Sequence, residues 1–140
     1  MEEAIYDTSA VIELVARKRQ RIPGYVSALT VVEYPPVLRF VDEVLYPRKR
    51  DYLLATKWQA ELRKIGTPLP AVDLVIAAQA YNENLALVTL DKHFKLLKQL
   101  VAPRLEIRDT IQGNSPTRHY FAPPHTRASP GVSELWVLGA

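Results

Sequence analysis

Residues 69–97 read LPAVDLVIAAQAYNENLALVTLDKHFKLL and predict a helix, a turn, a buried strand and a second helix. From Val72 the apolar residues recur with helical spacing, which places Asp73 in the first turn, where the helix dipole favours a negative charge. Residues 85–89 form a short apolar run typical of a strand covered on both faces. Asp91 follows this strand and is placed to cap the next helix. Because ligands of open parallel sheets bind beyond the carboxyl ends of the strands, Asp91 is a candidate site residue.

The composition is that of an ordinary globular domain. Of the 140 residues, 48% are hydrophobic and 24% are charged, which is enough for one substantial core. No apolar run reaches membrane-spanning length and the first residues do not form a secretory signal, so we expect a cytoplasmic protein without a membrane partner. The absence of cysteine excludes disulfides, thiolate metal sites and cysteine nucleophiles.

The chain is slightly basic, with a net charge of +3 and a pI near 9.2. Its basic residues gather in residues 17–21 and 48–50. Such runs are typical of solvated helix ends and loops, and a surface that contacts nucleic acid is the alternative. The charge pattern alone leaves both interpretations open.

A third acidic residue stands at the corner between a strand and a helix near the start of the chain. Residues 4–6 predict a short strand, which is followed by Asp7 and by an apolar-periodic helix. Thr8 or Ser9 can cap this helix, and Asp7 can also serve as the cap. If the strands are parallel, Asp7 and Asp91 face the same edge of the sheet.

Glu33 follows the second predicted strand, over residues 25–30. Thr30 and Glu33 have the spacing of a capping box, which is the structural alternative to a functional role. However, Pro35 and Pro36 cannot donate the hydrogen bonds of a second helical turn. We therefore expect the helix to begin at the prolines and Glu33 to lie in the turn just ahead of it.

The remaining elements complete an alternation of strands and helices. We predict helices over residues 37–46 and 51–65, the second with Trp58 in the core and with Gly66 at its end. Very short strands are expected near Leu69 and over residues 105–107. The expected fold class is α/β with a central, mostly parallel sheet.

The composition changes towards the C-terminus. Residues 113–131 are rich in Pro, Gly, Ser and Thr, and residues 132–138 are again apolar around Trp136. We therefore predict a domain over residues 1–112 and a C-terminal extension over residues 113–140 that is irregular and then apolar.

The predicted topology brings four acids together, because right-handed crossovers place all carboxyl ends of a parallel sheet on one edge. These acids are Asp7, Glu33, Asp73 and Asp91. At ~4 Å and an effective dielectric constant of ~20, each pair of like charges costs about 4 kcal/mol. Such a site persists only if it takes up protons or binds a cation. An oxygen-only donor set favours Mg²⁺ or Mn²⁺, which can activate water against a phosphodiester.

At these residues the sequence resembles the PIN domain family. The resemblance rests on Asp7-Thr8 after the first strand, SALTVVE over residues 27–33, Asp73 at the head of an Ile-Ala-Ala helix, and LVTLDKHF over residues 87–94. It implies a metal-dependent ribonuclease with a three-layer α/β/α sandwich. The four acids would be its metal-binding and catalytic residues, with Thr8 and Thr89 as supporting hydroxyl groups.

The same resemblance suggests biological partners. Many small prokaryotic PIN domains are VapC toxins that a VapB antitoxin neutralises, and this chain would then have RNA as its substrate, a VapB-like antitoxin as its partner and a homodimer as its assembly. We expect Arg17, Lys18 and Lys92 to contact the RNA backbone.

The main hypothesis is therefore a Mg²⁺- or Mn²⁺-dependent endoribonuclease in which Glu33 binds the metal or orients the attacking water. His93 is expected to be a helix-surface residue, because no second histidine lies at metal-binding spacing. One alternative is a catalytically inactive PIN-like module that binds RNA or protein, since the prolines after Glu33 and the C-terminal extension depart from the toxin pattern. A flavodoxin-like phosphoacceptor with Asp7 as the phosphorylated group ranks last.

Overall fold

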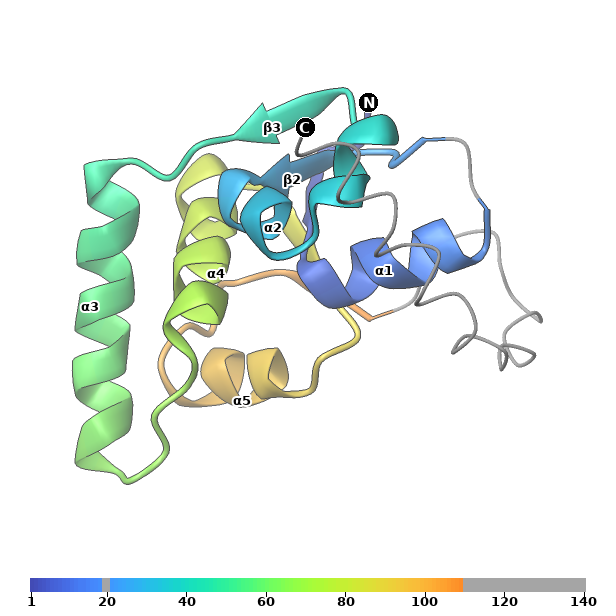
Figure 1. Cartoon of the computed structure of the whole chain (residues 1–140). Coiled ribbons are helices and arrows are strands. Elements are labelled where there is room, and N and C mark those ends of the chain that lie inside the picture. The colour runs from blue at the N-terminus through green and yellow to red at the C-terminus, as the bar shows by residue number, and fades with distance from the viewer. Residues whose placement is uncertain (19–20, 110–140) are drawn as a thin grey trace.

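The chain forms a five-stranded, all-parallel sheet with strand order β3-β2-β1-β4-β5 and helices on both faces (Figure 1). The computed structural model describes residues 1–18 and 21–109. The predicted boundary at residue 112 and the predicted extension over residues 113–140 lie outside the described residues. The elements are β1 (Ala4–Tyr6), α1 (Thr8–Ala16), β2 (Tyr25–Ser27), α2 (Ala28–Glu33), the 3₁₀ helix η1 (Pro35–Arg39), β3 (Glu43–Leu45), α3 (Lys49–Lys64), α4 (Ala71–Glu83), β4 (Ala86–Val88), α5 (His93–Leu100) and β5 (Ile107–Arg108).

The two faces of the sheet have separate cores, because successive side chains of a strand point in opposite directions. In β1, Ile5 packs with residues of α3, α4 and α5, whereas Ala4 and Tyr6 pack with residues of α1 and η1. Strand β4 repeats the pattern, with Leu87 on the first side and Val88 on the second. The predicted three-layer α/β/α arrangement is therefore confirmed.

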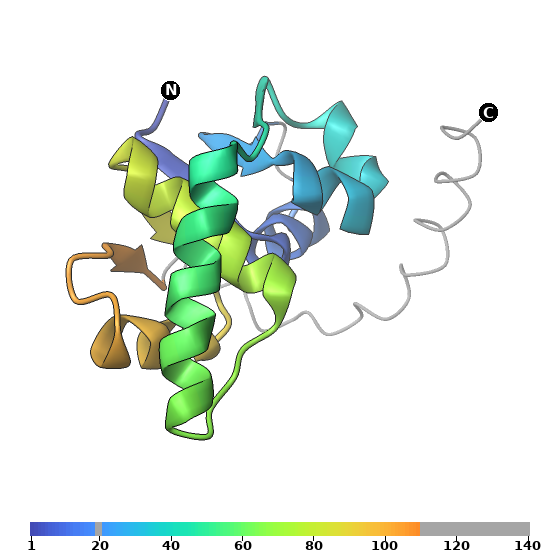
Figure 2. The same cartoon turned by 90° about the vertical axis from the view of Figure 1, so that its left-hand side faces the viewer.

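Helices α3 and α4 form an antiparallel pair, of which α3 is the outer member (Figure 2). Trp58 of α3 is 4% exposed and meets Tyr81 of α4 edge to face, with ring centroids 5.5 Å apart. This confirms the prediction that Trp58 is a core residue. The long helix ends just before Gly66, whose φ of 78° lies in the left-handed region that glycine tolerates best.

The third strand of the sheet is not where the sequence predicted it. Residues 37–46 were expected to be helical, but η1 ends at Arg39 and β3 follows as an edge strand paired with β2. The strand expected near Leu69 does not form. The side chain of Gln59 instead bonds both backbone groups of Leu69, at 3.1 Å to its N–H and 2.7 Å to its carbonyl. These bonds satisfy the polar groups that a sheet would otherwise pair.

The second strand is shorter than predicted, and this changes the setting of Glu33. Strand β2 ends at Ser27, whose Oγ accepts a hydrogen bond from Leu29 N at 3.0 Å and so caps α2. Thr30 and Glu33 therefore lie inside α2, neither as a capping box nor in a turn before a helix. The prediction that a helix begins at the prolines is correct for η1, which starts at Pro35.

The other strands agree with the prediction to within two residues. Strand β1 has the predicted bounds, β4 is one residue shorter at each end, and β5 begins two residues later than expected. Close packing between β1 and the start of β2 requires Gly24, because a Cβ atom there would lie 2.5 Å from the carbonyl oxygen of Ala4. Within the described ranges, no helix combines the length and the apolar character needed to cross a membrane.

Candidate metal centre

The acidic residues singled out from the sequence gather at the carboxyl edge of the sheet. Asp7 directly follows β1, Asp91 comes three residues after β4, and Glu33 is the last residue of the short helix that β2 leads into. Asp73 lies in the first turn of α4. The parallel topology therefore produces the convergence that the sequence predicted.

Asp7 is the buried centre of this group, with 4% of its surface exposed. One carboxylate oxygen, Oδ1, accepts hydrogen bonds from Ala10 N at 3.0 Å and from the Ser9 hydroxyl at 2.7 Å. The other, Oδ2, accepts one from the Thr89 hydroxyl at 2.6 Å. Burial raises the pKa of Asp7, although these three hydrogen bonds oppose the rise. Asp7 thus caps α1 and also links α1 to the end of β4.

Thr89 and Ser9 hold the loop that carries Asp91. While the hydroxyl of Thr89 donates to Asp7, its oxygen accepts from Asp91 N at 2.9 Å. The hydroxyl oxygen of Ser9 accepts from Leu90 N at 3.0 Å. Asp91 is therefore fixed relative to Asp7 through two short side chains. Ser9 was predicted only as a possible cap, and its contact with the β4 loop depends on a pairing of distant segments that sequence spacing does not reveal.

Glu33 is positioned by Thr8. The hydroxyl of Thr8 donates to Glu33 Oε1 at 2.6 Å and lies 3.1 Å from the hydroxyl oxygen of buried Thr30. This bond joins the first residue of α1 to the last residue of α2. Glu33 itself is exposed.

Asp73 differs from its counterpart in α3. In both helices the acid is the third residue, from which a carboxylate can bond the N–H of the N-cap residue. In α3, Asp51 does so by accepting from Arg48 N at 2.7 Å, and its other oxygen accepts from Asn82 Nδ2 at 2.7 Å. In α4 the N-cap is Pro70, which has no N–H to donate. Within the described residues, Asp73 has no hydrogen-bond or ion-pair partner.

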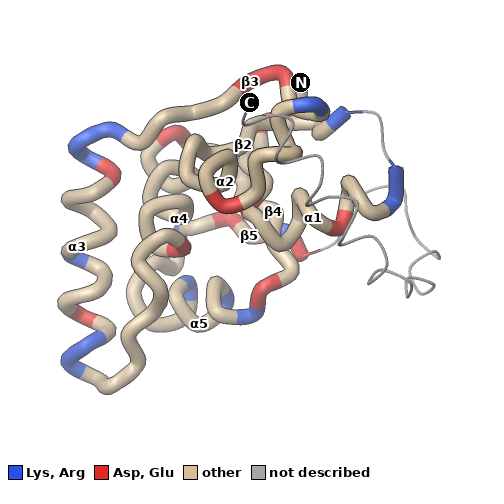
Figure 3. Tube along the Cα trace, viewed as in Figure 1, with Lys and Arg blue, Asp and Glu red and all other residues tan. Residues whose placement is uncertain are grey.

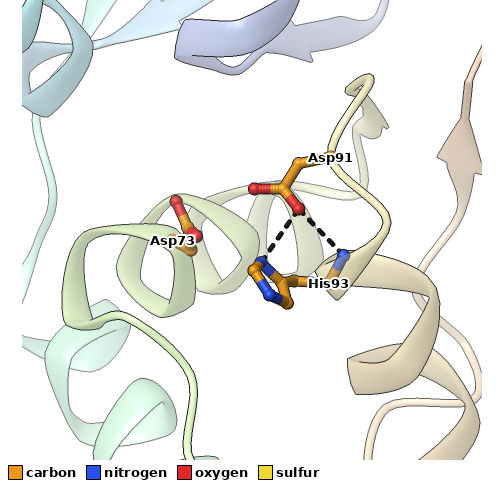
Figure 4. A group of neighbouring side chains, drawn as sticks. All are labelled: Asp73, Asp91 and His93. Atoms are coloured by element: carbon orange, nitrogen blue, oxygen red, sulfur yellow. Dashed lines mark hydrogen bonds and ion pairs between the residues drawn. The ribbon is translucent and has the colours of Figure 1, made fainter.

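The charges around Asp73 make its ionisation costly. Burial raises its pKa to about 6, with further contributions from Asp91, Asp7 and Glu33, while His93 acts in the opposite direction. Each of the other three acids is therefore close enough to disfavour the charged form of Asp73. Asp73, Asp91 and His93 each offer one ligand atom, and these three atoms lie within 4.8 Å of one another. Figure 4 shows the three side chains.

This arrangement suits a hard divalent cation. Two ligands of one Mg²⁺ can be at most about 4.2 Å apart, since metal–oxygen distances are about 2.1 Å. The three side chains must therefore move closer together before one ion can contact all of them. Asp73 offers a carboxylate that no donor among the described residues satisfies, and carboxylates are the preferred donors of Mg²⁺ and Mn²⁺. The donor set fits such an ion.

Comparison with known proteins shows which family the chain resembles. The family model described as PIN domain matches residues 36–100, which include Asp73 and Asp91. Over these residues the chain resembles the PIN domain family. No curated protein matches it in sequence.

Solved structures resemble this chain over most of its length. A chain of the DNA-bound VapBC complex from Salmonella typhimurium has a TM-score of 0.61 at 20% identity, covering 78% of this chain and 98% of that chain. VapBC-1 from nontypeable Haemophilus influenzae gives 0.57 at 26% identity, with 76% and 96% covered. VapBC2 from Rickettsia felis, bound to a promoter DNA fragment, gives 0.55 at 15% identity, with 75% and 97% covered.

The structure separates the basic residues that were expected to contact RNA. Lys92 is exposed next to Asp91, at the candidate metal centre. Arg17 and Lys18 lie beyond the far end of the nine-residue α1, about 13 Å along the helix axis from its first turn, and Arg17 is paired with Glu13 at 2.9 Å. Figure 3 shows basic residues spread over both ends of α3 and over α5 rather than gathered around the acids.

The sequence prediction gave His93 no role at the site. It is exposed on the first residue of α5, as expected, but its ring bonds Asp91 instead of facing only solvent. The spacing Asp-x-His at the start of a helix was the available signal. The prediction considered only the spacing between histidines, and no second histidine lies at metal-binding spacing.

Proposed function

We propose that this chain is a PIN domain that acts as a Mg²⁺- or Mn²⁺-dependent endoribonuclease. The observation that supports the proposal most directly is Asp73, a partly buried carboxylate with a pKa of about 6, three acidic neighbours and no donor among the described residues. A buried negative charge without a partner is unfavourable in any folded protein. A divalent cation among Asp73, Asp91 and Asp7 removes this cost.

The proposed roles follow from the contacts of each residue. Asp73 and Asp91 would hold the metal directly, and Asp7 would complete the site from its buried position between Ser9 and Thr89. A bound divalent ion lowers the pKa of coordinated water and stabilises negative charge on a phosphodiester oxygen. Thr8 fixes one oxygen of Glu33, so the other can bind the metal or accept a hydrogen bond from the attacking water. Thr89 orients both Asp7 and the backbone of Asp91.

We further propose that the chain is the toxin of a toxin–antitoxin pair with a VapB-like antitoxin as its partner, and that it forms a homodimer. Support for the antitoxin comes from the similar solved structures, which are described as VapBC complexes. Co-expression with the neighbouring open reading frame followed by co-purification tests this assignment. Recovery of the chain alone, with unrestrained growth of the host in the absence of the neighbour, would contradict it.

The nuclease proposal is tested by cleavage of RNA with Mn²⁺ or Mg²⁺, with excess EDTA, and with two variants, Asp7→Asn and Asp73→Asn. We expect EDTA and each substitution to reduce cleavage by about 100-fold or more, as loss of a group that stabilises transition-state charge does. Asp42→Asn is the matched control, because Asp42 is an exposed acid paired with Arg21 at the amino end of the sheet. Equal cleavage in all samples would refute the proposal. Metal binding without cleavage would favour an inactive RNA- or protein-binding module.

A further inference from the structure

Three exposed apolar side chains lie around the acids of the candidate metal centre. They belong to Ile12 of α1, Val32 of α2 and Leu90 after β4, which are 46%, 77% and 44% exposed. Single exposed apolar residues are common on protein surfaces, so their exposure alone indicates no partner. Their arrangement is the informative feature, because each is next to a residue that holds the site together. We call these three side chains the apolar rim.

Hydrogen bonds made by α1 place the apolar rim beside the acids. Val32 is followed in the chain by the glutamate whose carboxylate accepts from the hydroxyl of Thr8 at 2.6 Å. Leu90 precedes one of the aspartates, and its backbone N–H donates to Ser9 Oγ at 3.0 Å. Ile12 is one helical turn beyond Thr8 and Ser9 on the same face of α1. The surface therefore combines apolar side chains with carboxylates, and a partner of matching chemistry carries aromatic or aliphatic groups next to a cation.

The described part of the chain ends close to this surface, one residue after β5. The carbonyl of Arg108, the last residue of β5, accepts a hydrogen bond from Thr89 N at 3.0 Å, and the hydroxyl of Thr89 bonds Asp7. Residues 110–140 therefore start about one strand spacing, ~4.8 Å, from the loop that follows β4. Nine residues of irregular chain span about 15–18 Å on average, so residue 118 is within reach of the acids.

The sequence beyond the described residues contains one segment with the matching chemistry. Residues 118–121 read Arg-His-Tyr-Phe, which places a cation next to two large aromatic side chains. Arginine pairs with carboxylates through two parallel hydrogen bonds, and aromatic rings supply a large apolar contact area. Arg127 stands between threonine and alanine, without an aromatic neighbour. The apolar residues 132–138 include Glu134, which the four acids would repel.

We propose that residues 118–121 bind back to this surface, with Arg118 beside the four acids and Tyr120 and Phe121 on the apolar rim. Asp73 is the carboxylate that lacks a donor among the described residues, so it is available to the guanidinium group. Arginine and a divalent ion would then compete for the same acids, a consequence that rests on the proposed metal-dependent function. At an effective concentration of about 1 mM, a contact with a dissociation constant of about 0.25 mM weakens Mn²⁺ binding about fivefold.

The absence of cysteine allows this contact to be measured by disulfide formation in the full chain. In EDTA under mild oxidation, Val32→Cys should form an intramolecular disulfide with Phe121→Cys. The matched control pairs Val32→Cys with Ala128→Cys. Positions 121 and 128 are 12 and 19 residues beyond Asp109, and without binding these tethers differ only about twofold in effective concentration. We expect the first pair to react about tenfold faster than the control pair.

The role of the arginine is tested in the same assay. Arg118→Gln should slow disulfide formation between positions 32 and 121 about fivefold, because it removes the cation that holds the segment beside the acids. Arg127→Gln is the matched control and should leave the rate unchanged. Titration of the cysteine-free chain with Mn²⁺ should give a dissociation constant about fivefold lower for Arg118→Gln and unchanged for Arg127→Gln.

Several outcomes would overturn this inference. One is a rate difference between the two cysteine pairs no larger than the tether lengths explain, and another is an equal effect of the two arginine substitutions. A disulfide between two chains would assign the surface to a second copy of the protein. Faster disulfide formation with Leu135→Cys would assign it to residues 132–138 instead.

The disulfide assay distinguishes this inference from the proposed function, because it requires neither metal nor RNA. If the chain cleaves RNA with Mn²⁺ but the two cysteine pairs react alike, the nuclease proposal stands and the contact of residues 118–121 is refuted. If the pair at positions 32 and 121 reacts selectively in a chain that binds no Mn²⁺ at millimolar concentration, the contact is confirmed and the proposed metal-dependent function fails.

Discussion

Replacing Asp73 by asparagine should stabilise the metal-free protein, although the same change should abolish its activity. Asparagine is nearly isosteric with aspartate and carries no charge. In the wild-type chain, Asp73 has a pKa of about 6 in the folded state and an ordinary value of 3.8 when unfolded. Above pH 6 the folded protein must ionise this group at a cost that the unfolded chain does not bear. Asp73→Asn removes that cost.

The magnitude follows from the difference of about two pKa units. At 1.36 kcal/mol per unit, full conversion would give about 3 kcal/mol. Because Asp73 is only partly buried, solvent screening reduces this value, and we expect a gain of about 1–2 kcal/mol at pH 8. For a chain of this size the gain corresponds to a rise in Tm of about 4–6 °C.

The sign of the effect also depends on pH in a defined way. A raised pKa means that the folded protein binds the proton more tightly, so the contribution of Asp73 to stability is largest below pH 3.8 and is lost as the pH rises through 6. The advantage of Asp73→Asn should therefore be full at pH 8 and fall to a small fraction at pH 4.

Urea unfolding in EDTA, followed by tryptophan fluorescence, measures these differences by linear extrapolation. Two substitutions serve as controls. Asp42→Asn should change the stability little, because its partner Arg21 is exposed. Asp51→Asn should destabilise the protein, because Asp51 bonds a backbone N–H and the amide of Asn82. If Asp73→Asn is as stable as the wild-type chain, or if its gain is the same at pH 4 and pH 8, the electrostatic argument is wrong.

Three other changes should follow from the same structure. Mn²⁺ at 100 times its dissociation constant should stabilise the wild-type chain by about 2.7 kcal/mol in calorimetry, and EDTA should reverse this; no such stabilisation is expected for Asp73→Asn. Thr89→Val leaves buried Asp7 without one donor and should cost about 1–3 kcal/mol in urea unfolding, with weaker Mn²⁺ binding; unchanged stability would contradict the network described for Thr89. Gly24→Ala places a Cβ atom 2.5 Å from Ala4 O and should cost about 1–3 kcal/mol, which a Tm within 1–2 °C of the wild-type value would disprove.

The convergence of the acids was predictable because it depends on topology more than on contacts. Asp7 and Asp91 each follow an apolar run, and the carboxyl ends of parallel strands meet at one edge. The helical period around Asp73 was also strong enough to place it in a first turn, as the structure confirms. In these positions the local pattern and the tertiary arrangement agree.

The third strand could not be predicted, because its local sequence does not specify its conformation. Strand β3 has three residues at the edge of the sheet, and its Glu43-Val44-Leu45 sequence is compatible with a helix or a strand. Its conformation is selected by pairing with β2, which is a tertiary contact. Near Leu69 the predicted strand does not form, because Gln59 of α3 provides the hydrogen bonds that a neighbouring strand would have given. Neither partner can be identified from the local sequence.

The contact between His93 and Asp91 was missed because it depends on the direction of a side chain. Spacing shows that two residues are neighbours in the chain, but it does not show that a ring bonds the neighbouring carboxylate. The same limit applies to Thr8 and Glu33, which are 25 positions apart and joined by one hydroxyl group.

Because Pro70 has no N–H, residue 70 determines whether Asp73 can form a hydrogen bond within its own helix. A search for relatives that counted only acidic positions would accept a chain with serine at position 70 and all four acids in place. In such a chain the third residue of α4 could turn back and close its own helix, as Asp51 does in α3. Proline at position 70 leaves the carboxylate at position 73 available to other partners. Distant relatives should therefore be compared at positions 70 and 73 together when the availability of their acids is judged.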